Sequence, residues 1–228
     1  MFRSILASGI AALALLASAG TATATPVYIV HGIPGSALGV DEDLLVDIEV
    51  DGTCALTEVP FGTIAEEDLP AGPYEIAVYL SDGECGGLLA FTSRINVAAF
   101  GTAIAIADLD PNGTPELSEL TVNTTPADLH NAQLTVYHEA AAPAVEVALA
   151  SGGRPVATFE IAADEQTFPA EVEPGNYDVT ITLVGGEEPV LEIEDLPLAA
   201  RTSYAAIAVG ALTPGATFAV LLVEIPAS

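Results

Sequence analysis

Leu69-Pro-Ala-Gly-Pro-Tyr-Glu-Ile-Ala-Val78 is the stretch that decides the fold, because a second version, Val172-Glu-Pro-Gly-Asn-Tyr-Asp-Val-Thr-Ile181, returns about a hundred residues later. Each version places a glycine two residues before a tyrosine and then continues with alternating polarity. Gly72 and Gly175 can supply the positive φ that a tight turn into a strand often needs. The pattern predicts a turn followed by a β-strand in both places.

The two tyrosines, Tyr74 and Tyr177, follow the logic of the tyrosine corner of β-sandwiches. Each offers a large ring for a core and a hydroxyl that can reach back to the turn backbone. A motif that occurs twice indicates two copies of one sandwich unit.

Short strand-like segments in the same order support this duplication. Leu45–Asp51 alternates, with Asp47 on the polar side and Ile48 on the apolar side, and this predicts a half-buried strand. Further predicted strands are Pro26–His31, Leu88–Thr92, Thr102–Ala107 and Leu117–Val122, and the matching segments of the second copy are Gln133–His138, Ala144–Leu149 and Tyr204–Val209. Because helical periodicity is missing outside the first residues, the sequence predicts an all-β protein of two tandem antiparallel Ig-like β-sandwich domains.

Residues 1–24 predict a secretory signal peptide. Arg3 supplies a positive start, an apolar run follows from Ile5 to Ala17, and Ala22-Thr-Ala24 fits a cleavage site. The apolar run is short for a membrane span, so an uncleaved anchor is the less favoured alternative. We expect the first domain at 26–125, a short linker, the second domain at 132–228, and no transmembrane segment in the mature chain.

The charge of the chain is strongly one-sided. It has 32 Asp and Glu, four Arg and no Lys, for a formal net charge of -28. Such a surface repels nucleic acids and anionic lipid, so we expect neither as a partner. Solubility, adaptation to salty surroundings and attraction of cations are the three explanations that remain. The acidic runs Asp41–Asp43 and Glu66–Asp68 are interpreted as solvated loops that could join a cation site.

The sequence resembles a bacterial secreted family called domain of unknown function 4397. The resemblance rests on Ile29-Val-His31 with Pro34, Asp47-Ile-Glu-Val-Asp-Gly52, Phe61-Gly62, and Leu69-Pro-Ala-Gly72 with Tyr74. The second copy keeps His138 and Pro143 but has Ser151-Gly-Gly in place of the Asp-Gly turn. The resemblance implies a secreted β-sandwich, often in tandem, and it supplies no catalytic residues.

Two motifs suggest chemistry that their surroundings do not support. His31-Gly-Ile-Pro-Gly-Ser36 resembles the oxyanion loop of α/β-hydrolases, but no serine lies in a Gly-x-Ser-x-Gly frame and no strand–helix alternation is present. His31 and His138 occupy matching places and could be ligands, although a structural role bonded to nearby backbone is favoured. His130 stands alone in the linker. We therefore predict no catalytic residues, no cofactor and no enzymatic activity.

One segment matches a calcium-loop pattern. Asp108-Leu-Asp-Pro-Asn-Gly-Thr-Pro-Glu-Leu-Ser-Glu119 fits the spacing of an EF-hand loop, and Gly113 permits its sharp bend. The preceding residues alternate like a strand, however, and the matching segment of the second copy, Gly210–Gly215, has no acids. The sequence therefore favours a plain β-hairpin and leaves the metal question open.

Cys54 and Cys85 are the only cysteines. An even count in an exported chain indicates a disulfide, and two free thiols or a metal pair are the alternatives. The sequence as a whole predicts an exported, non-catalytic interaction or scaffold module, secreted or at the cell surface with the periplasm possible, whose partner is unknown. A calcium- or carbohydrate-binding module is the alternative.

Overall fold

The computed structural model describes residues 24–122, 124, 126, 128–167 and 169–226. Residues 1–23 of the predicted signal peptide lie outside the described residues. The described part consists of strands and turns with one short 3-10 turn, η1 (Gly35–Leu38), and it confirms the all-β prediction. No helix in this part of the chain is long and apolar enough to cross a bilayer.

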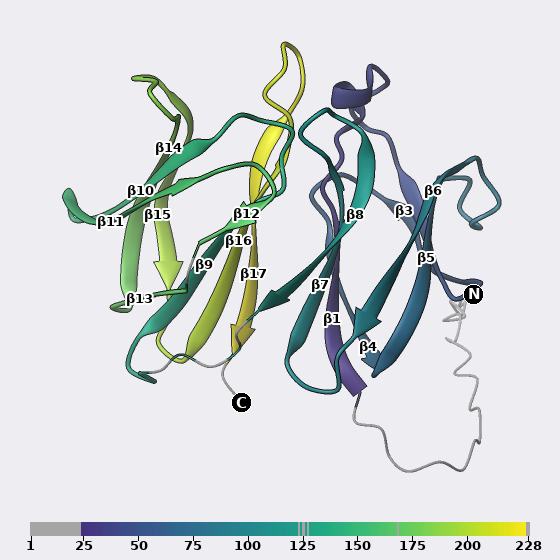
Figure 1. The fold of residues 1–228 in the computed structure, drawn as a ribbon, viewed down its shortest axis with the longest axis horizontal. Helices are drawn as coiled ribbons and strands as arrows, with labels where there is room; N and C mark the ends of the chain where they lie inside the picture. The colour runs from purple at the N-terminus through teal and green to yellow at the C-terminus, as the bar shows by residue number, and fades with distance from the viewer. Residues whose placement is uncertain (1–23, 123, 125, 127, 168, 227–228) are drawn as a thin grey trace, which may run out of the picture.

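Within the described residues, eight strands form the N-terminal sandwich and nine form the C-terminal sandwich. Figure 1 shows the two sandwiches. The N-terminal strands are β1 (Ala24–His31), β2 (Val46–Val50), β3 (Thr53–Val59), β4 (Ile64–Pro70), β5 (Gly72–Leu80), β6 (Leu89–Val97), β7 (Thr102–Leu109) and β8 (Pro115–Val122). The C-terminal strands are β9 (Ala132–His138), β10 (Val145–Ser151), β11 (Arg154–Ile161), β12 (Glu165–Gln166), β13 (Ala170–Val172), β14 (Gly175–Leu183), β15 (Pro189–Leu198), β16 (Thr202–Gly210) and β17 (Phe218–Pro226). The expected domain limits at 26–125 and 132–228 stay predictions.

The two sandwiches have the same topology. The N-terminal sheets run β4-β1-β7-β8 and β3-β2-β5-β6, and the C-terminal sheets run β12-β9-β16-β17, with β13 also on β9, and β11-β10-β14-β15. In each sandwich the first strand pairs in parallel with the strand before the last, β1 with β7 and β9 with β16, while the other pairs are antiparallel. His31 lies opposite Ala107 and His138 opposite Ala208, so the two registers match residue by residue.

Both tyrosine corners form as the sequence predicts. The hydroxyl of Tyr74 donates to the carbonyl of Pro70 at 2.8 Å, and that of Tyr177 donates to the carbonyl of Glu173 at 2.5 Å. The positive φ expected at both glycines is present in one copy only. Gly72 has φ +154, whereas Gly175 does not adopt a positive φ, so the second turn does not need its glycine for that reason.

Several expectations about polar segments are wrong. Glu66–Asp68 is not a loop but part of β4, which pairs with the edge of β1. The strands predicted at 88–92 and 117–122 are longer, and β3 and β4 have no counterpart among the predicted strands. Asp47, expected on the solvent side of its strand, is completely buried. Sequence alternation misplaced Asp47 because it ignores the loop that folds over that side.

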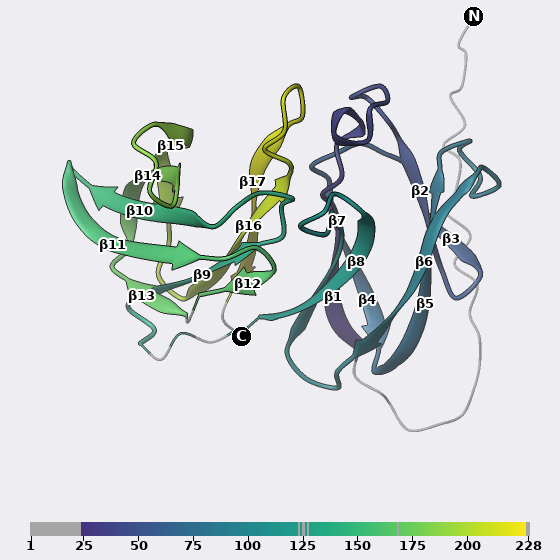
Figure 2. The same cartoon turned by 45° about the horizontal axis from the view of Figure 1, so that its top comes forward.

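The two sandwiches meet face to face through their inner sheets, β4-β1-β7-β8 and β12-β9-β16-β17 (Figures 1 and 2). We call this contact the joint. Strands β7, β9 and β16 are buried along their whole length, because one face of each lies in its own sandwich core and the other lies in the joint. The buried apolar residues of the joint are Val30, Ile104, Ile106, Val122, Tyr137, Ala205, Ile207, Val209, Val223 and Ile225.

The backbones of the two sandwiches approach each other very closely at one end of the joint. The N–H of Gly210 donates to the carbonyl of Gly32 across the joint at 3.1 Å. A methyl group at Gly32 would lie 2.9 Å from Val209 Cγ1, which is closer than carbon atoms approach one another. Gly32 belongs to the His-Gly-Ile-Pro-Gly segment, so the glycine of that hydrolase-like motif permits close approach of the sandwiches.

Candidate functional site

The segment that matches a calcium-loop pattern forms the expected β7–β8 hairpin, and its acidic side chains are not gathered at one point. Asp110 Oδ1 accepts from the N–H groups of Asn112 and Thr114 at 2.8 and 2.7 Å, which closes the β7–β8 hairpin. Glu119 instead accepts from the N–H of Asn96 in β6 at 2.9 Å. Asp108 is buried. Among the described residues no three His, Cys, Asp or Glu side chains are grouped so that they could hold a metal ion.

Asp108 instead forms a buried carboxyl pair with Glu139 beside the joint. Asp108 is fully buried near the end of β7, and Glu139 is 5% exposed just after β9. Neither carboxylate oxygen of Asp108 has a hydrogen-bond donor. Burial first, and then the charge of Glu139, raise the pKa of Asp108 to about 9.

The surroundings of the pair are also acidic. Burial raises the pKa of Glu139, and burial followed by neighbouring carboxylates raises the pKa of Glu116 on β8 and of Asp164 between β11 and β12. Two ionised carboxylates held close together in a buried place repel each other, which favours the protonated form of one of them. The arrangement keeps a proton inside the molecule, and its two halves come from different sandwiches.

Sequence reasoning missed this pair. The sequence places Asp108 in a hairpin whose pattern leaves a metal open, and no motif in it singles out Glu139. The registers put Glu139 in the place of Gly32, because the N–H groups of both residues donate to equivalent carbonyls, those of Ala208 and Ala107. The sequence signal for this pair was that the second copy has an acidic residue, Glu139, where the first copy has Gly32.

The two matching histidines have the structural role that the sequence favours. His31 Nδ1 lies 3.2 Å from the carbonyl of Val59, and His138 Nε2 lies 3.0 Å from the carbonyl of Pro143. Both side chains are almost completely buried. Burial lowers the pKa of His31, although backbone carbonyls oppose it. His138 differs in one respect, since its Nδ1 is buried without a hydrogen-bond partner.

A second polar centre organises the disulfide loop of the N-terminal sandwich. Cys54 and Cys85 form the predicted disulfide. Buried Asp47 accepts hydrogen bonds from Ser81 Oγ at 2.5 Å and from the N–H of Cys85 at 3.1 Å. The remaining donors to Asp47 are the N–H groups of Glu58, Asp82 and Gly83. Burial alone would raise the pKa of Asp47, but these hydrogen bonds outweigh it and hold the pKa well below its usual range.

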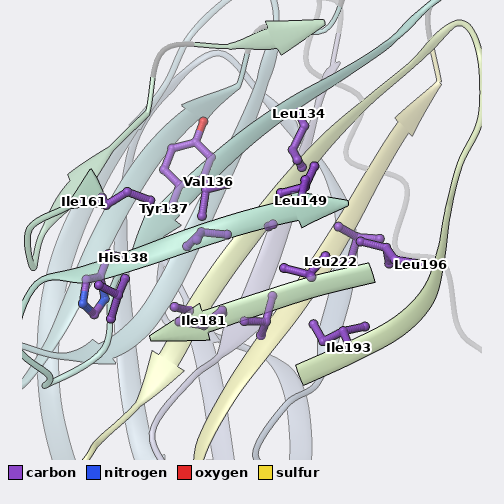
Figure 3. Close-up of a pocket in the computed structure, with 16 residues that line it drawn as sticks. Leu134, Val136, Tyr137, His138, Leu149, Ile161, Ile181, Ile193, Leu196 and Leu222 are labelled. Carbon is purple, nitrogen blue, oxygen red and sulfur yellow. The ribbon is translucent and has the colours of Figure 1, made fainter. Parts of the chain in front are cut away.

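An apolar cavity of about 150 Å³ lies inside the C-terminal sandwich. Figure 3 shows its lining side chains converging from both sheets, among them Leu134 and Val136 of β9 and Ile181 of β14. Tyr137 and His138 are the lining residues that have polar side chains, and the hydroxyl of Tyr137 is bonded to the carbonyl of Thr121 in the joint at 3.2 Å. In the N-terminal sandwich the equivalent space is only about 10 Å³.

Comparison with known proteins identifies no family. No protein-family model matches the chain, and no curated protein matches it. Among solved structures, the TIE protein of Bacillus anthracis is 12% identical over 81% of this chain and 50% of its own, with a TM-score of 0.26. A Parabacteroides distasonis protein whose name proposes a role in cell adhesion is 8% identical over 90% of this chain and all of its own, with a TM-score of 0.21. The chain thus spans half of the length of the first of these structures, and similarities this weak carry no argument about function.

Proposed function

We propose that this chain is an exported, non-catalytic β-sandwich protein that acts as a rigid interaction module outside the cell or at its surface. The joint is the observation that carries the proposal. Ile104, Ile106 and Ile207 are completely buried in it, and each such side chain stabilises by about 1.5–3 kcal/mol relative to an exposed one. Domains joined by an extensive apolar contact do not move independently. The chain therefore holds two outer sheets at a fixed separation and orientation.

Two further observations support export. The Cys54–Cys85 disulfide fits an oxidising compartment. The sequence resemblance to domain of unknown function 4397 and the predicted signal peptide point to the same location. The net charge of -28 keeps such a module soluble and away from anionic surfaces.

The absence of enzymatic activity is part of the proposal. The hydroxyl oxygen of Ser36, the serine of the hydrolase-like motif, is buried and makes no hydrogen bond, so it has no base to activate it. The buried carboxyl pair is shielded from solvent, which suits a structural element better than a group that must meet a substrate.

A capture experiment with two matched glycine variants tests the proposal. The epitope-tagged chain is produced in its native cells, exposed to external protease, and cross-linked to its neighbours through carboxylates, because the chain has no lysine for amine reagents. In G32A the added methyl meets Val209 and forces the joint apart, whereas in G175A it has only an ordinary contact with Tyr177 Cε2 at 3.9 Å.

We expect an oxidised, protease-accessible chain that is cross-linked to the same neighbour in the wild type and in G175A. G32A should lose this cross-link and show a larger radius of gyration by small-angle scattering. A chain found inside the cell with free thiols would overturn the export part. Equal cross-linking of G32A and wild type, at a demonstrably larger radius for G32A, would overturn the rigid-module part.

A further inference from the structure

We propose that the cavity of the C-terminal sandwich binds a small apolar molecule with one hydroxyl group, similar in size and chemistry to phenol. The hydroxyl group of this ligand donates a hydrogen bond to Nδ1 of His138. The proposal goes beyond the role of the chain as a rigid module and does not depend on it. It rests on the size of the cavity, on one unsatisfied buried atom, and on a comparison between the two sandwiches.

The cavity has the size and lining of a ligand site. An apolar void of about 150 Å³ stays dry in other proteins and accepts benzene or xenon. The cavity in this chain has the same volume and lies between β9 and β16 on one side and β10 and β14 on the other (Figure 3). Empty space in a close-packed interior forfeits dispersion contacts, so an occupant of matching shape is bound favourably.

His138 gives the cavity one polar anchor. It follows Leu134 and Val136 at alternate positions of β9, so the three side chains lie on the same face of the strand, toward the cavity (Figure 3). Because Nε2 faces the carbonyl of Pro143 at 3.0 Å, Nε2–H donates to that carbonyl, and a ring that carries only this hydrogen leaves Nδ1 as an acceptor. That acceptor is buried and has no partner. A buried acceptor without a donor is costly, and a ligand hydroxyl would remove this cost.

The N-terminal sandwich shows that the fold does not require the cavity. Equal registers pair Ile29 with Val136, Ile48 with Val147, and Leu117 with Val220 as equivalent positions. Each equivalence follows from the residue that lies opposite on the neighbouring strand. Ile29 lies opposite Ala105 and Val136 opposite Ala206. Ile48 lies opposite Val78 and Val147 opposite Ile181, while Leu117 lies opposite Ala107 and Val220 opposite Ala208.

At each of these three positions the N-terminal sandwich has the larger side chain by one methylene. Differences on β5 and β14 cancel, since Ile76 is larger than Val179 while Val78 is smaller than Ile181. Differences of the opposite sign also occur in the lining, where Leu134, Leu149 and Ile161 are each one methylene larger than the equivalent Val27, Val50 and Val59. The smaller cavity of the N-terminal sandwich therefore depends on where the larger side chains lie, not on their total volume. The N-terminal histidine also differs, because His31 uses Nδ1 to contact the carbonyl of Val59. The C-terminal sandwich alone combines open space with a free acceptor.

The strand beside His138 offers a route of access. In the N-terminal sandwich the edge of β1 is covered by the seven residues of β4. In the C-terminal sandwich the equivalent edge of β9 is covered by two fragments, β12 and β13, of two and three residues. Short edge segments with few ladder hydrogen bonds open locally at low free-energy cost, which admits a small molecule to the core.

Binding of phenol and of toluene to the full chain tests the proposal. The two probes have nearly the same shape, but only phenol has a donor for Nδ1. Binding is followed by NMR saturation transfer and by the shift in unfolding temperature. We expect phenol to bind with a Kd of about 0.1–1 mM, which is in the range open to a ligand of this size. Toluene should bind about five- to tenfold more weakly, since it leaves the acceptor of His138 without a partner.

The double variant V147I/V220L introduces, at two positions that line the cavity, the larger side chains of the N-terminal sandwich. We expect it to fold and to lose phenol binding at least tenfold. V156I/V184L is its matched control, because the same two changes fall on valines that are 46% and 44% exposed. This control should bind phenol as the wild type does. The cavity proposal is overturned if phenol fails to bind the wild type, or if folded V147I/V220L binds it equally well. The role of His138 is overturned if toluene binds as tightly as phenol.

Discussion

The buried carboxyl pair makes the stability of this protein depend on pH in an unusual direction. Asp108 has no exposed surface, and its pKa is raised to about 9, while an unfolded chain titrates it at about 4. Between these values the unfolded state releases the proton and the folded state keeps it. Stability contributed by this group is therefore complete below pH 4 and falls as the pH rises toward 9.

The magnitude follows from the linkage relation. One proton held only by the folded state costs about 1.4 kcal/mol for each pH unit inside the window. From pH 5 to pH 8 this is about 4 kcal/mol as an upper bound, and relaxation and sharing of the proton with Glu139 reduce it to about 2–4 kcal/mol. Asp108→Asn removes the titration and keeps the shape, and its amide can donate to Glu139. We expect the variant to be more stable than the wild type at pH 8 by this amount.

Urea unfolding followed by circular dichroism, at half-unit steps from pH 5 to pH 8.5, measures the difference. The other titratable groups near the pair are Glu116, Asp110, Asp164 and His138, and the difference between variant and wild type isolates Asp108 from them. Glu146→Gln, a change at an exposed carboxylate, is the control and should run parallel to the wild type. The reasoning is refuted if Asp108→Asn also runs parallel to the wild type over the whole range.

Four further predictions concern the rest of the chain. Replacing Cys54 and Cys85 with serine should cost about 3–4 kcal/mol by denaturant unfolding, since the disulfide closes a loop with a sequence separation of 31; an unchanged midpoint contradicts this. Asp47→Asn should cost about 2–3 kcal/mol at pH 7, because an amide nitrogen cannot accept from the loop. The folded pKa of Asp47 is lowered, so this penalty should shrink as the pH falls below about 4, and a constant penalty would argue against it. Tyr177→Phe should cost about 1 kcal/mol and Tyr74→Phe less, because Tyr74 is the more exposed of the two; thermal unfolding decides their order. Raising sodium chloride from about 0.05 M to about 1 M should raise the unfolding temperature, because it screens the repulsion of a chain with a net charge of -28, and no increase would rule out net repulsion.

Local sequence patterns were enough to predict the main features of the repeated sandwich unit. The Gly-x-Tyr motif ending at Tyr74 and Tyr177 predicted both corners, and the paired cysteines predicted the disulfide. These features depend on residues that are near in sequence or unique in type. Strands with one buried face, such as β10, could also be found, because alternation reports burial on one side.

The sequence by itself determined that this chain folds into strands, in two copies, with one disulfide. Tertiary structure decided what lies on the second face of β7, β9 and β16, and hence that the two sandwiches form one joint. It also decided that Asp108 meets Glu139, and that the space beside His138 stays open. The physical reason is that side-chain periodicity encodes which residues avoid water, whereas the partner that excludes the water comes from distant segments and is fixed only by packing.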